Sequence, residues 1–341
     1  MKKLLSVLLA LTLCLSLLPP VFAAGDEAIE AAEALYALGL FKGTGTDENG
    51  KPIFELDRTP QRTEGVTMLV RLLGADEVAQ DGDWEVPFTD VPDWALPYVG
   101  YAYEAGLTKG TGDTTFGSTL EVNAAQYLTF VLRALGYEDG EDKDFLWNSP
   151  WTLTDELGIT HGEYNAETAV FTRGDVAILS YRALSAKVKD SELTLRDTMT
   201  LAAYVGYAVS FLMIAYGAQG LATAAEENDT ITAMQHIGMI ERSYEESINQ
   251  LDRIILFGAD HDEICSAAKA LRDHWIDLPE RNNSLDQFLV WYEAFCNEDF
   301  LNQTAVLFEA LNTAFTNTFP ELDVNSELPD AEDLPDTEDL P

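Results

Sequence analysis

Basic side chains are scarce in this sequence. It contains 20 Lys and Arg residues against 59 Asp and Glu residues, which gives a formal net charge of −39 at pH 7. Proteins that bind nucleic acid or an anionic membrane surface use clusters of Lys and Arg to neutralise phosphate groups. The charge balance therefore argues against both kinds of binding surface, and it is typical of a soluble, exported protein.

Cysteine is scarce as well, with Cys14, Cys265 and Cys296 in the whole chain. Three cysteines cannot build the framework of several disulfides that staples small secreted domains. Cys14 lies in an N-terminal apolar run, which leaves Cys265 and Cys296 as one pair that could form outside the cell. Pairing depends on the distance between their Cα atoms, which the sequence does not contain.

Familiar catalytic patterns are also missing. The histidines at 236, 261 and 274 lack the His-Glu-x-x-His spacing of a zinc site, and no Ser or Cys nucleophile motif occurs. The polar segment 260–263 has two interpretations, a metal site or the solvated start of a helix, and the second is favoured. We therefore predict no metal, no cofactor and no enzymatic activity.

The N-terminus has the pattern of a secretory signal peptide. Lys2 and Lys3 precede an apolar run over residues 4–18, two prolines follow, and Val21-Phe22-Ala23 provides a small-residue cleavage site. The apolar run is too short to span a bilayer comfortably, which favours a signal peptide over a membrane anchor. We predict a signal peptide over residues 1–23 and a secreted protein.

A helix, glycine loop, helix unit occupies residues 88–137. Its first helix is predicted from aromatic and small residues that recur at helical spacing: Trp94, Tyr98, Tyr101, Ala102 and Ala105. Gly106 ends that helix, and Gly110 and Gly112 permit a tight loop. A second apolar stripe follows, ending at Gly136: Leu128, Val131, Leu132 and Leu135.

The same unit occurs three times. The loop Gly-Leu-Phe-Lys-Gly-Thr-Gly at 39–45 recurs as Gly-Leu-Thr-Lys-Gly-Thr-Gly at 106–112, and more loosely as Gly-Ile-Thr-His-Gly at 158–162. Repeats of this length cannot bury their apolar faces alone and pack on their neighbours. We predict repeats at about 27–75, 87–137 and 144–189.

These residues resemble the S-layer homology (SLH) module. The resemblance rests on Phe88-Thr-Asp-Val followed by Trp94, on the Gly-Leu-x-x-Gly loop, and on Thr172-Arg-Gly-Asp. It covers about residues 27–190 and implies an all-α, pseudo-threefold domain over residues 24–190. It further implies non-covalent attachment of a secreted protein to the bacterial cell wall, through pyruvylated secondary cell wall polysaccharide.

Cationic side chains stand at matched positions of the repeats. The position before the second loop glycine holds Lys42, Lys109 and His161. The position that opens each second helix holds Arg62, Ala124 and Arg173. A helix N-terminus favours anions, and a guanidinium matches a carboxylate in two-point contact. An arginine there, beside a glycine loop, predicts a carboxylate-binding corner that suits a pyruvate ketal.

With the resemblance, these positions give a predicted glycan-binding set: Arg62, Arg173, Lys42, Lys109, His161, Asp90, Trp94, Gly110 and Gly112. Alternatives stand beside several of them. Arg62 and Arg173 could instead form internal pairs with nearby acids such as Glu64 and Asp175. Trp94 suits either the core or a sugar platform, and Asp90 suits a turn cap as well as a ligand neighbour.

Two features qualify this site further. Ala124 replaces the arginine in the second repeat, which puts direct ligand contact by that motif in doubt. The mid-helix arginines are interpreted as solvated or as ion-paired between repeats: Arg71, Arg133 and Arg182.

The chain changes character after residue 190. No charged residue occurs over 201–225, a length that could span a bilayer. Acids follow it without a basic cluster, which favours a buried central helix over a membrane span. Apolar spacing predicts further helices around 231–255, 265–275, 288–295 and 306–315. We predict a helical bundle over 191–320. Residues 321–341 hold nine acids and no base, which predicts a disordered tail.

The resulting hypothesis is a non-enzymatic cell-wall protein that displays a helical module. The alternatives are a wall-bound enzyme with its active site in the bundle, and a membrane-associated protein that uses residues 201–225. No pattern in the sequence predicts an oligomeric state.

Overall fold

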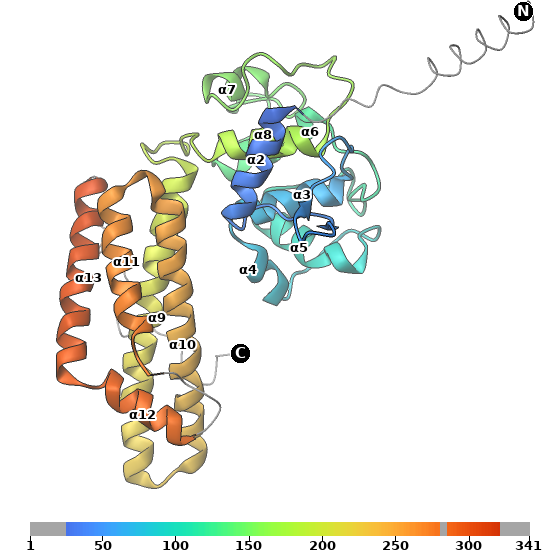
Figure 1. Ribbon diagram of the computed structural model, residues 1–341. Helices are drawn as coiled ribbons and strands as arrows, with labels where there is room; N and C mark the ends of the chain where they lie inside the picture. The colour runs from blue at the N-terminus through green and yellow to red at the C-terminus, as the bar shows by residue number, and fades with distance from the viewer. Residues whose placement is uncertain (1–24, 280–284, 321–341) are drawn as a thin grey trace, which may run out of the picture. The chain divides into compact units, whose positions relative to one another are not determined.

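A computed structural model describes residues 25–279 and 285–320, and these residues are mostly helical (Figure 1). The chain divides into two compact units, with the division between Glu192 and Leu193. The predicted signal peptide at 1–23 and the predicted acidic tail at 321–341 lie outside the described residues. The two units are described separately.

The N-terminal unit is built from short helices. In chain order its elements are α2 (Asp26–Ala37), β1 (Gly45–Thr46), β2 (Pro52–Ile53), α3 (Arg62–Leu72), α4 (Asp76–Asp81), η1 (Asp93–Ala95), α5 (Leu96–Glu104), α6 (Ala124–Ala134), α7 (Trp151–Glu156) and α8 (Arg173–Ala183). The described fold is therefore helical apart from one hairpin, which the all-α prediction misses. That hairpin lies in the enlarged loop of the first repeat, where the Asp47 carboxylate accepts the N–H groups of Asn49 and Lys51 and closes the turn.

The predicted glycine turns have the same geometry in all three repeats. The glycines at 39, 106 and 158 follow α2, α5 and α7 with φ of 71°, 72° and 71°. The N–H after each glycine donates to the carbonyl five residues earlier: Leu40 to Leu35, Leu107 to Ala102, and Ile159 to Thr154. Such a left-handed residue closes the end of a helix and lets the chain reverse. Each repeat therefore enters its loop in the same way.

The second helices of the repeats, α3, α6 and α8, form the centre of this unit. Each of the three contacts the other two. Their starts are fixed alike, because a side chain three residues on accepts the N–H of the capping residue: Glu64 for Gln61, Gln126 for Asn123, and Asp175 for Thr172. Between α6 and α8, the hydroxyls of Tyr127 and Ser180 lie 2.6 Å apart in the core.

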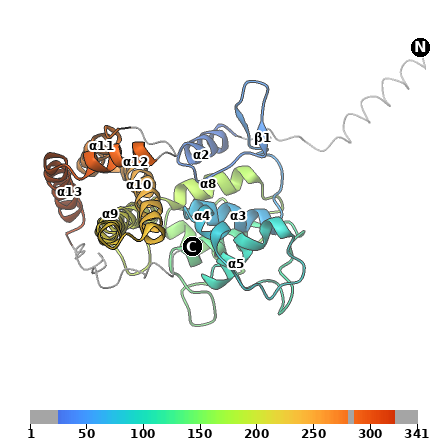
Figure 2. The same cartoon turned by 90° about the horizontal axis from the view of Figure 1, so that it is seen from below.

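The first helix of the unit packs on its last. α2 lies beside α8 in both ribbon views (Figures 1 and 2). Gly174 makes the approach possible, because a Cβ there would lie 3.1 Å from the Cβ of Ala28 and 3.2 Å from the carbonyl oxygen of Leu56. The first and third repeats are thereby joined.

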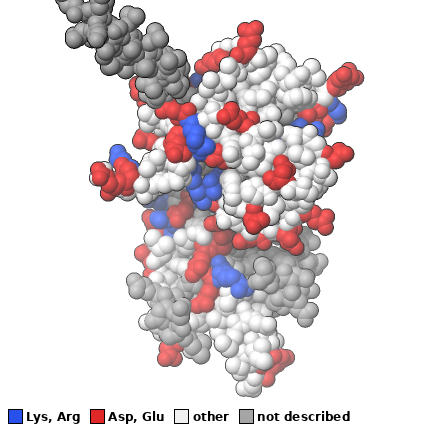
Figure 3. Space-filling view, turned by 90° about the vertical axis from the view of Figure 1, so that its right-hand side faces the viewer, with Lys and Arg blue, Asp and Glu red and all other residues white. Residues whose placement is uncertain are grey.

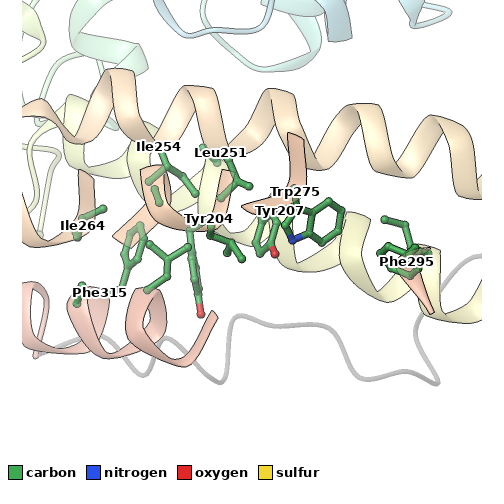
Figure 4. Close-up of a cluster of buried hydrophobic side chains, with 14 of the residues drawn as sticks. Tyr204, Tyr207, Leu251, Ile254, Ile264, Trp275, Phe295 and Phe315 are labelled. Atoms are coloured by element: carbon green, nitrogen blue, oxygen red, sulfur yellow. The ribbon is translucent and has the colours of Figure 1, made fainter. Parts of the chain in front are cut away.

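The C-terminal unit is a bundle of long helices. Its elements are α9 (Leu195–Glu227), α10 (Thr230–Phe257), η2 (Gly258–Asp260), α11 (Asp262–Ile276), α12 (Leu285–Phe295) and α13 (Glu298–Thr318). All five predicted helices are present. Aromatic side chains fill the core, where Tyr204 packs on Phe315 and Tyr207 on Trp275 (Figure 4).

The apolar helix α9 supplies much of this core. It is the one helix in the described ranges that is long and apolar enough to cross a membrane, and half of its most apolar window is buried within the bundle. Tyr204, Tyr207 and Ile214 are fully buried. This packing agrees with a buried central helix.

Two details of the bundle differ from a simple reading of the pattern. Ile231 and Met234 keep the helical spacing of α10 but are 75% and 67% exposed, since they lie in its first turns, beyond the part that packs in the core.

Cys265 and Cys296 are both free thiols. The Cys265 thiol donates instead to the carbonyl oxygens of Ile255 and Gly258.

Candidate functional site

Two pockets in the N-terminal unit lie between neighbouring repeats, and each contains one of the predicted arginines. The larger, here called the Arg62 pocket, has a volume of about 350 Å³. Its lining comes from three parts of the chain: the start of α3, the loop of the second repeat, and α6 with the segment after it. The residues are Arg62, Lys109, Gly110, Thr111, Gln126, Thr129, Phe130, Arg133, Asp139 and Trp147.

The smaller pocket, here called the Arg173 pocket, has a volume of about 140 Å³. It is built in the same way from the start of α8, the loop of the first repeat, and α3. Its lining is Lys42, Gly43, Thr44, Glu64, Thr67, Met68, Arg71, Trp94 and Arg173. The arginine that opens α3 therefore lies at the loop of the second repeat, and the arginine that opens α8 lies at the loop of the first. The Arg173 pocket is thus a second contact between the third and first repeats.

Arg62 is buried without a carboxylate partner. It is 5% exposed, its Nη2 lies 3.4 Å from the Thr108 hydroxyl, and its Nε has no hydrogen-bond partner. The guanidinium carbon lies 5.1 Å from the ring centre of Phe116 and 5.0 Å from that of Phe130. Burial, with a further contribution from Arg133, lowers the pKa of Arg62 to about 10, so the group remains cationic at neutral pH.

Arg173 is buried to the same degree but is better satisfied. It is 4% exposed, and its Nε donates to the carbonyl oxygen of Phe54 at 2.8 Å. Its Nη2 donates to the carbonyl oxygen of Lys42 at 3.3 Å, and its Nη1 lies 3.4 Å from the Met68 sulfur. Burial and then the charge of Arg58 lower the pKa of Arg173.

The alternative internal pairs are not formed. The Glu64 carboxylate receives two hydrogen bonds from Arg58, at 2.7 and 2.8 Å, rather than any from Arg62. The Asp175 carboxylate caps α8 through Thr172 and accepts the Tyr164 hydroxyl. Within the described parts of the chain, neither pocket arginine therefore has an ion-pair partner.

In each pocket a lysine and a second arginine are joined by an aspartate. Asp76 does not line the Arg173 pocket, but it pairs with two residues that do, Lys42 and Arg71, both at 2.7 Å. In the Arg62 pocket, Asp139 pairs with Lys109 at 3.1 Å and with Arg133 at 2.8 Å. The lysine ammonium groups remain about half exposed or more, so each can still meet a ligand at the pocket mouth.

An exposed tryptophan stands at each pocket. Trp94 is 52% exposed and lines the Arg173 pocket, so it is not part of the core. Trp147 is 55% exposed and lines the Arg62 pocket. Each comes from the segment that leads into the following repeat. A flat, exposed ring beside a cationic pocket suits the apolar face of a sugar.

The third place where a pocket could form, between the start of α6 and the loop of the third repeat, lacks the opening arginine and the loop lysine. Ala124 stands where the other repeats have an arginine, and His161 where they have lysine. Arg182, the match of Arg71 and Arg133, is occupied by two carboxylates, Glu27 at 2.6 Å and Glu163 at 2.8 Å. His161 lines neither pocket, and this position has become a tie between the repeats.

Other predicted site residues have structural roles. The Asp90 carboxylate accepts the backbone N–H groups of residues 116, 117 and 118, at 2.7, 2.8 and 3.0 Å. It is therefore a loop cap, and it does not line either pocket. Gly110 lines the Arg62 pocket with φ of 73°, whereas Gly112 does not line it.

Sequence reasoning missed several residues that line the pockets or pair with their lining. Asp76 and Asp139 lie in or beside acidic linkers, where one carboxylate is not distinguishable by composition. Trp147 is absent from the predicted set, because it lies in the segment that leads into the third repeat and not in a loop or at a helix start. A cue existed for the arginines at 71 and 133, because each lies nine residues after the position that opens its helix, residue 62 or residue 124.

The surface charge agrees with a local cationic site in an acidic protein. In the upper half of the face drawn in Figure 3, Lys and Arg side chains gather in a narrow band beside uncharged surface, while Asp and Glu are spread more widely. In the described residues of both units, no group of three or more His, Cys, Asp or Glu side chains is placed to hold a metal ion. Residues 260–263 form the end of η2 and the start of α11.

Part of this sequence is similar to known proteins. The S-layer homology domain family matches residues 87–119. The chain is 34% identical over 197 residues to the "Cell surface protein" of Thermoanaerobacter kivui, a match that covers 54% of this chain and 24% of that protein. It is 33% identical over 189 residues to the "Middle cell wall protein" of Brevibacillus brevis, covering 52% and 17%.

An endoglucanase of a Bacillus species is also similar, at 33% identity over 122 residues, covering 33% of this chain and 13% of the enzyme. The chain thus spans about a quarter or less of the length of these relatives. What they share with it is one part of larger proteins. Residues 87–119 therefore match the S-layer homology domain family, and about half of the chain is similar to part of bacterial cell-surface proteins.

Proposed function

We propose that this protein is a non-enzymatic cell-wall anchor. In this proposal, all three repeats are SLH motifs that act together as one pseudo-threefold domain. The N-terminal unit binds an anionic wall glycan, specifically the carboxylate of pyruvylated secondary cell wall polysaccharide. The C-terminal bundle is the module that is held at the cell surface.

The observation that carries the proposal is the state of Arg62. Burying a cationic group without a partner is unfavourable, and the unmet Nε leaves a buried donor unsatisfied. An incoming carboxylate would supply the missing acceptor and the opposite charge. Charge-assisted hydrogen bonds of this kind contribute roughly 1.5–3 kcal/mol each.

The large negative charge of the chain does not oppose this binding strongly. Charges separated by more than about 8 Å at physiological salt are largely screened. The pocket itself holds Arg62, Lys109 and Arg133 against one carboxylate, Asp139. The local field around a ligand in the pocket is therefore positive, although the protein as a whole is acidic.

A polymer can contact both pockets at once, which a single sugar cannot do. Once the Arg62 pocket is occupied, a weaker contact of the same polymer with Lys42 and Trp94 at the Arg173 pocket becomes intramolecular and raises the overall affinity. Trp94 and Trp147 would each cover a neighbouring sugar ring. The third position contributes no anion site in this proposal, because Arg182 is already neutralised by Glu27 and Glu163.

Pull-down on isolated wall polymer tests the proposal. The full chain should be retained on polymer that carries its pyruvyl groups and should be lost when those groups are removed by mild acid. The protein with both Arg62→Gln and Arg173→Gln should bind neither polymer, while Lys143→Gln serves as a control, because Lys143 is exposed, pairs with Glu138 and lines neither pocket. Equal retention on the two polymers by the unaltered protein would rule out the carboxylate as the recognised group.

A further inference from the structure

We propose that the two pockets are unequal: the Arg62 pocket holds the acidic group of the glycan, whereas Arg173 acts mainly as a structural tie between the third repeat and the first. This inference rests on the proposed function, and it assigns different work to two residues that occupy the same position in their repeats.

The first argument is the number of free donors. A guanidinium has five N–H groups in a fixed plane. In Arg62 the one hydrogen bond is a long contact of 3.4 Å to Thr108, so the Nε edge and most of the Nη donors remain available. In Arg173, all three nitrogens already have a partner in the protein. Three of the five N–H groups of Arg173 are thus engaged, among them the Nε–H that side-on bidentate contact with a carboxylate needs, whereas the Nε–H of Arg62 is free.

The second argument concerns the group by which each loop contacts the guanidinium. In the Arg173 pocket, the carbonyl oxygen of Phe54 accepts the Nε at 2.8 Å. In the Arg62 pocket, the loop presents the ring of Phe116 to the guanidinium, and Phe130 lies near it as well. Contacts with ring faces attract the cation but leave its in-plane donors free. Arg173 also lies 5.3 Å from the ring centre of Phe41, but its Nε–H is held by the Phe54 carbonyl oxygen. The guanidinium of Arg62 is oriented mainly by rings, and its Nε–H stays free.

The third argument is room and charge. The Arg62 pocket has a volume of about 350 Å³, against about 140 Å³ for the Arg173 pocket. Gln126, which is neutral, lines the larger pocket at the position where Glu64 lines the smaller one. Although Arg58 pairs with Glu64, that carboxylate still makes the smaller pocket less favourable for a second anion.

The tie made by Arg173 joins distant parts of the chain. Its hydrogen bonds reach residues 42 and 54, which lie more than a hundred positions earlier in the loop of the first repeat. The backbone N–H groups of Arg173 and Gly174 also donate to the carbonyl oxygens of Arg58 and Leu56. Removing the side chain should therefore loosen that loop and the start of α8.

The experiment compares Arg62→Gln, Arg173→Gln and the control Lys143→Gln in the full chain, since Lys143 lines neither pocket. Two quantities are measured: affinity for pyruvylated wall polymer, and amide hydrogen exchange across residues 25–192. We expect Arg62→Gln to lower the affinity at least tenfold while exchange stays as in the unaltered protein. We expect Arg173→Gln to lower the affinity less than threefold and to raise exchange over residues 42–58 and in α8.

A second measurement does not depend on the folding of the Arg173 variant. Native mass spectrometry of the unaltered protein with a pyruvylated monosaccharide should show one tightly bound sugar, and Arg62→Gln should show none. Two equivalent sugars, or equal losses of affinity in the two variants, would overturn the inequality while leaving the anchor function intact. If the unaltered protein does not distinguish the polymers, the proposed function itself fails.

Discussion

Asp76 and Asp139 occupy the same place in successive repeats, and each joins a loop lysine to a helix arginine. Asp76 lies 2.7 Å from Lys42 and from Arg71, and Asp139 lies 3.1 Å from Lys109 and 2.8 Å from Arg133. Each carboxylate thereby fixes two cations at a pocket that is otherwise positive. The arrangement holds the loop against the second helix of the same repeat.

The first prediction concerns acid stability. The hydrogen bond from Arg133, aided by Lys109, lowers the pKa of Asp139 to about 2, below an unfolded value of about 3.9. A carboxyl group with a depressed folded pKa contributes stability that is fully present above the unfolded pKa and is lost as pH falls toward the folded pKa. Between about pH 4 and pH 2 this should remove on the order of 2 kcal/mol from the free energy of unfolding.

Urea unfolding of the unaltered protein and of Asp139→Asn measures this effect. The unaltered protein should be the more stable at pH 6, and the difference should shrink toward zero near pH 2. Because all other acids are shared, the comparison isolates Asp139. A difference that stays constant from pH 6 to pH 2 would show that its charge does not matter.

The second prediction concerns the loop of the Arg62 pocket. Gly110 has φ of 73°, and a Cβ there would lie 2.4 Å from the Phe88 ring and 2.9 Å from the Thr115 carbonyl oxygen. Gly110→Ala should therefore cost more than about 1 kcal/mol and weaken polymer binding. Gly112→Ala is the matched control, since the nearest atom to its Cβ would be 3.9 Å away and its φ is not positive. Equal behaviour of the two variants in unfolding and pull-down would contradict the loop geometry.

The third prediction separates Asp90 from the binding site. Its carboxylate accepts three backbone N–H groups, so Asp90→Ala leaves them without their acceptor. We expect the free energy of unfolding to fall by about 2 kcal/mol or more. Affinity for the wall polymer, measured where the variant is still folded, should change less than threefold.

Asp93→Ala is the comparison for that experiment, because Asp93 opens η1 on the surface nearby. A large loss of affinity in folded Asp90→Ala, with little change for Asp93→Ala, would show that Asp90 takes part in binding the wall polymer.

The fourth prediction concerns the bundle. Gly220 of α9 faces the ring of His236, and a Cβ there would lie 2.1 Å from the ring carbon Cε1. Gly220→Ala should destabilise the C-terminal unit by about 1–3 kcal/mol through overpacking. Gly238→Ala in α10 should instead stabilise it by up to about 1 kcal/mol, because its nearest neighbour would be 4.0 Å away and alanine favours a helix. Thermal unfolding followed by helical circular dichroism distinguishes the two, and a shift in the same direction for both would refute this view of the packing.

The sequence predicted what is local and repeated. Glycine at 39, 106 and 158 and the spacing of apolar residues sufficed for the turns and helices, because these depend on neighbouring residues. The matched positions predicted an arginine beside a glycine loop, but they did not predict that Arg62 meets the loop of the next repeat, because that depends on how the repeats pack. Ion-pair partners depend on the tertiary fold and were not predicted, because the sequence contains many acids that could pair with Arg71 or Arg133.

Exposure was the other property that the pattern could not supply. Trp94 keeps helical spacing with Tyr98, yet the chain enters α5 through the short turn η1, and this leaves the ring at a pocket rather than in the core. Ile231 and Met234 show the same effect at the start of α10. Periodicity identifies which residues share a face, and the neighbouring elements decide whether that face is covered.

The packing of α2 on α8 has a consequence for synthesis. The N-terminal helix is made first, but its partner is complete only after about a hundred and fifty further residues, and the Glu27–Arg182 pair spans the same interval. The unit should therefore acquire its stable form late and all at once, instead of repeat by repeat. A fusion tag that contained residues 87–119 alone would lack both neighbours that shape its pockets, and it should fail to hold a cargo on the wall.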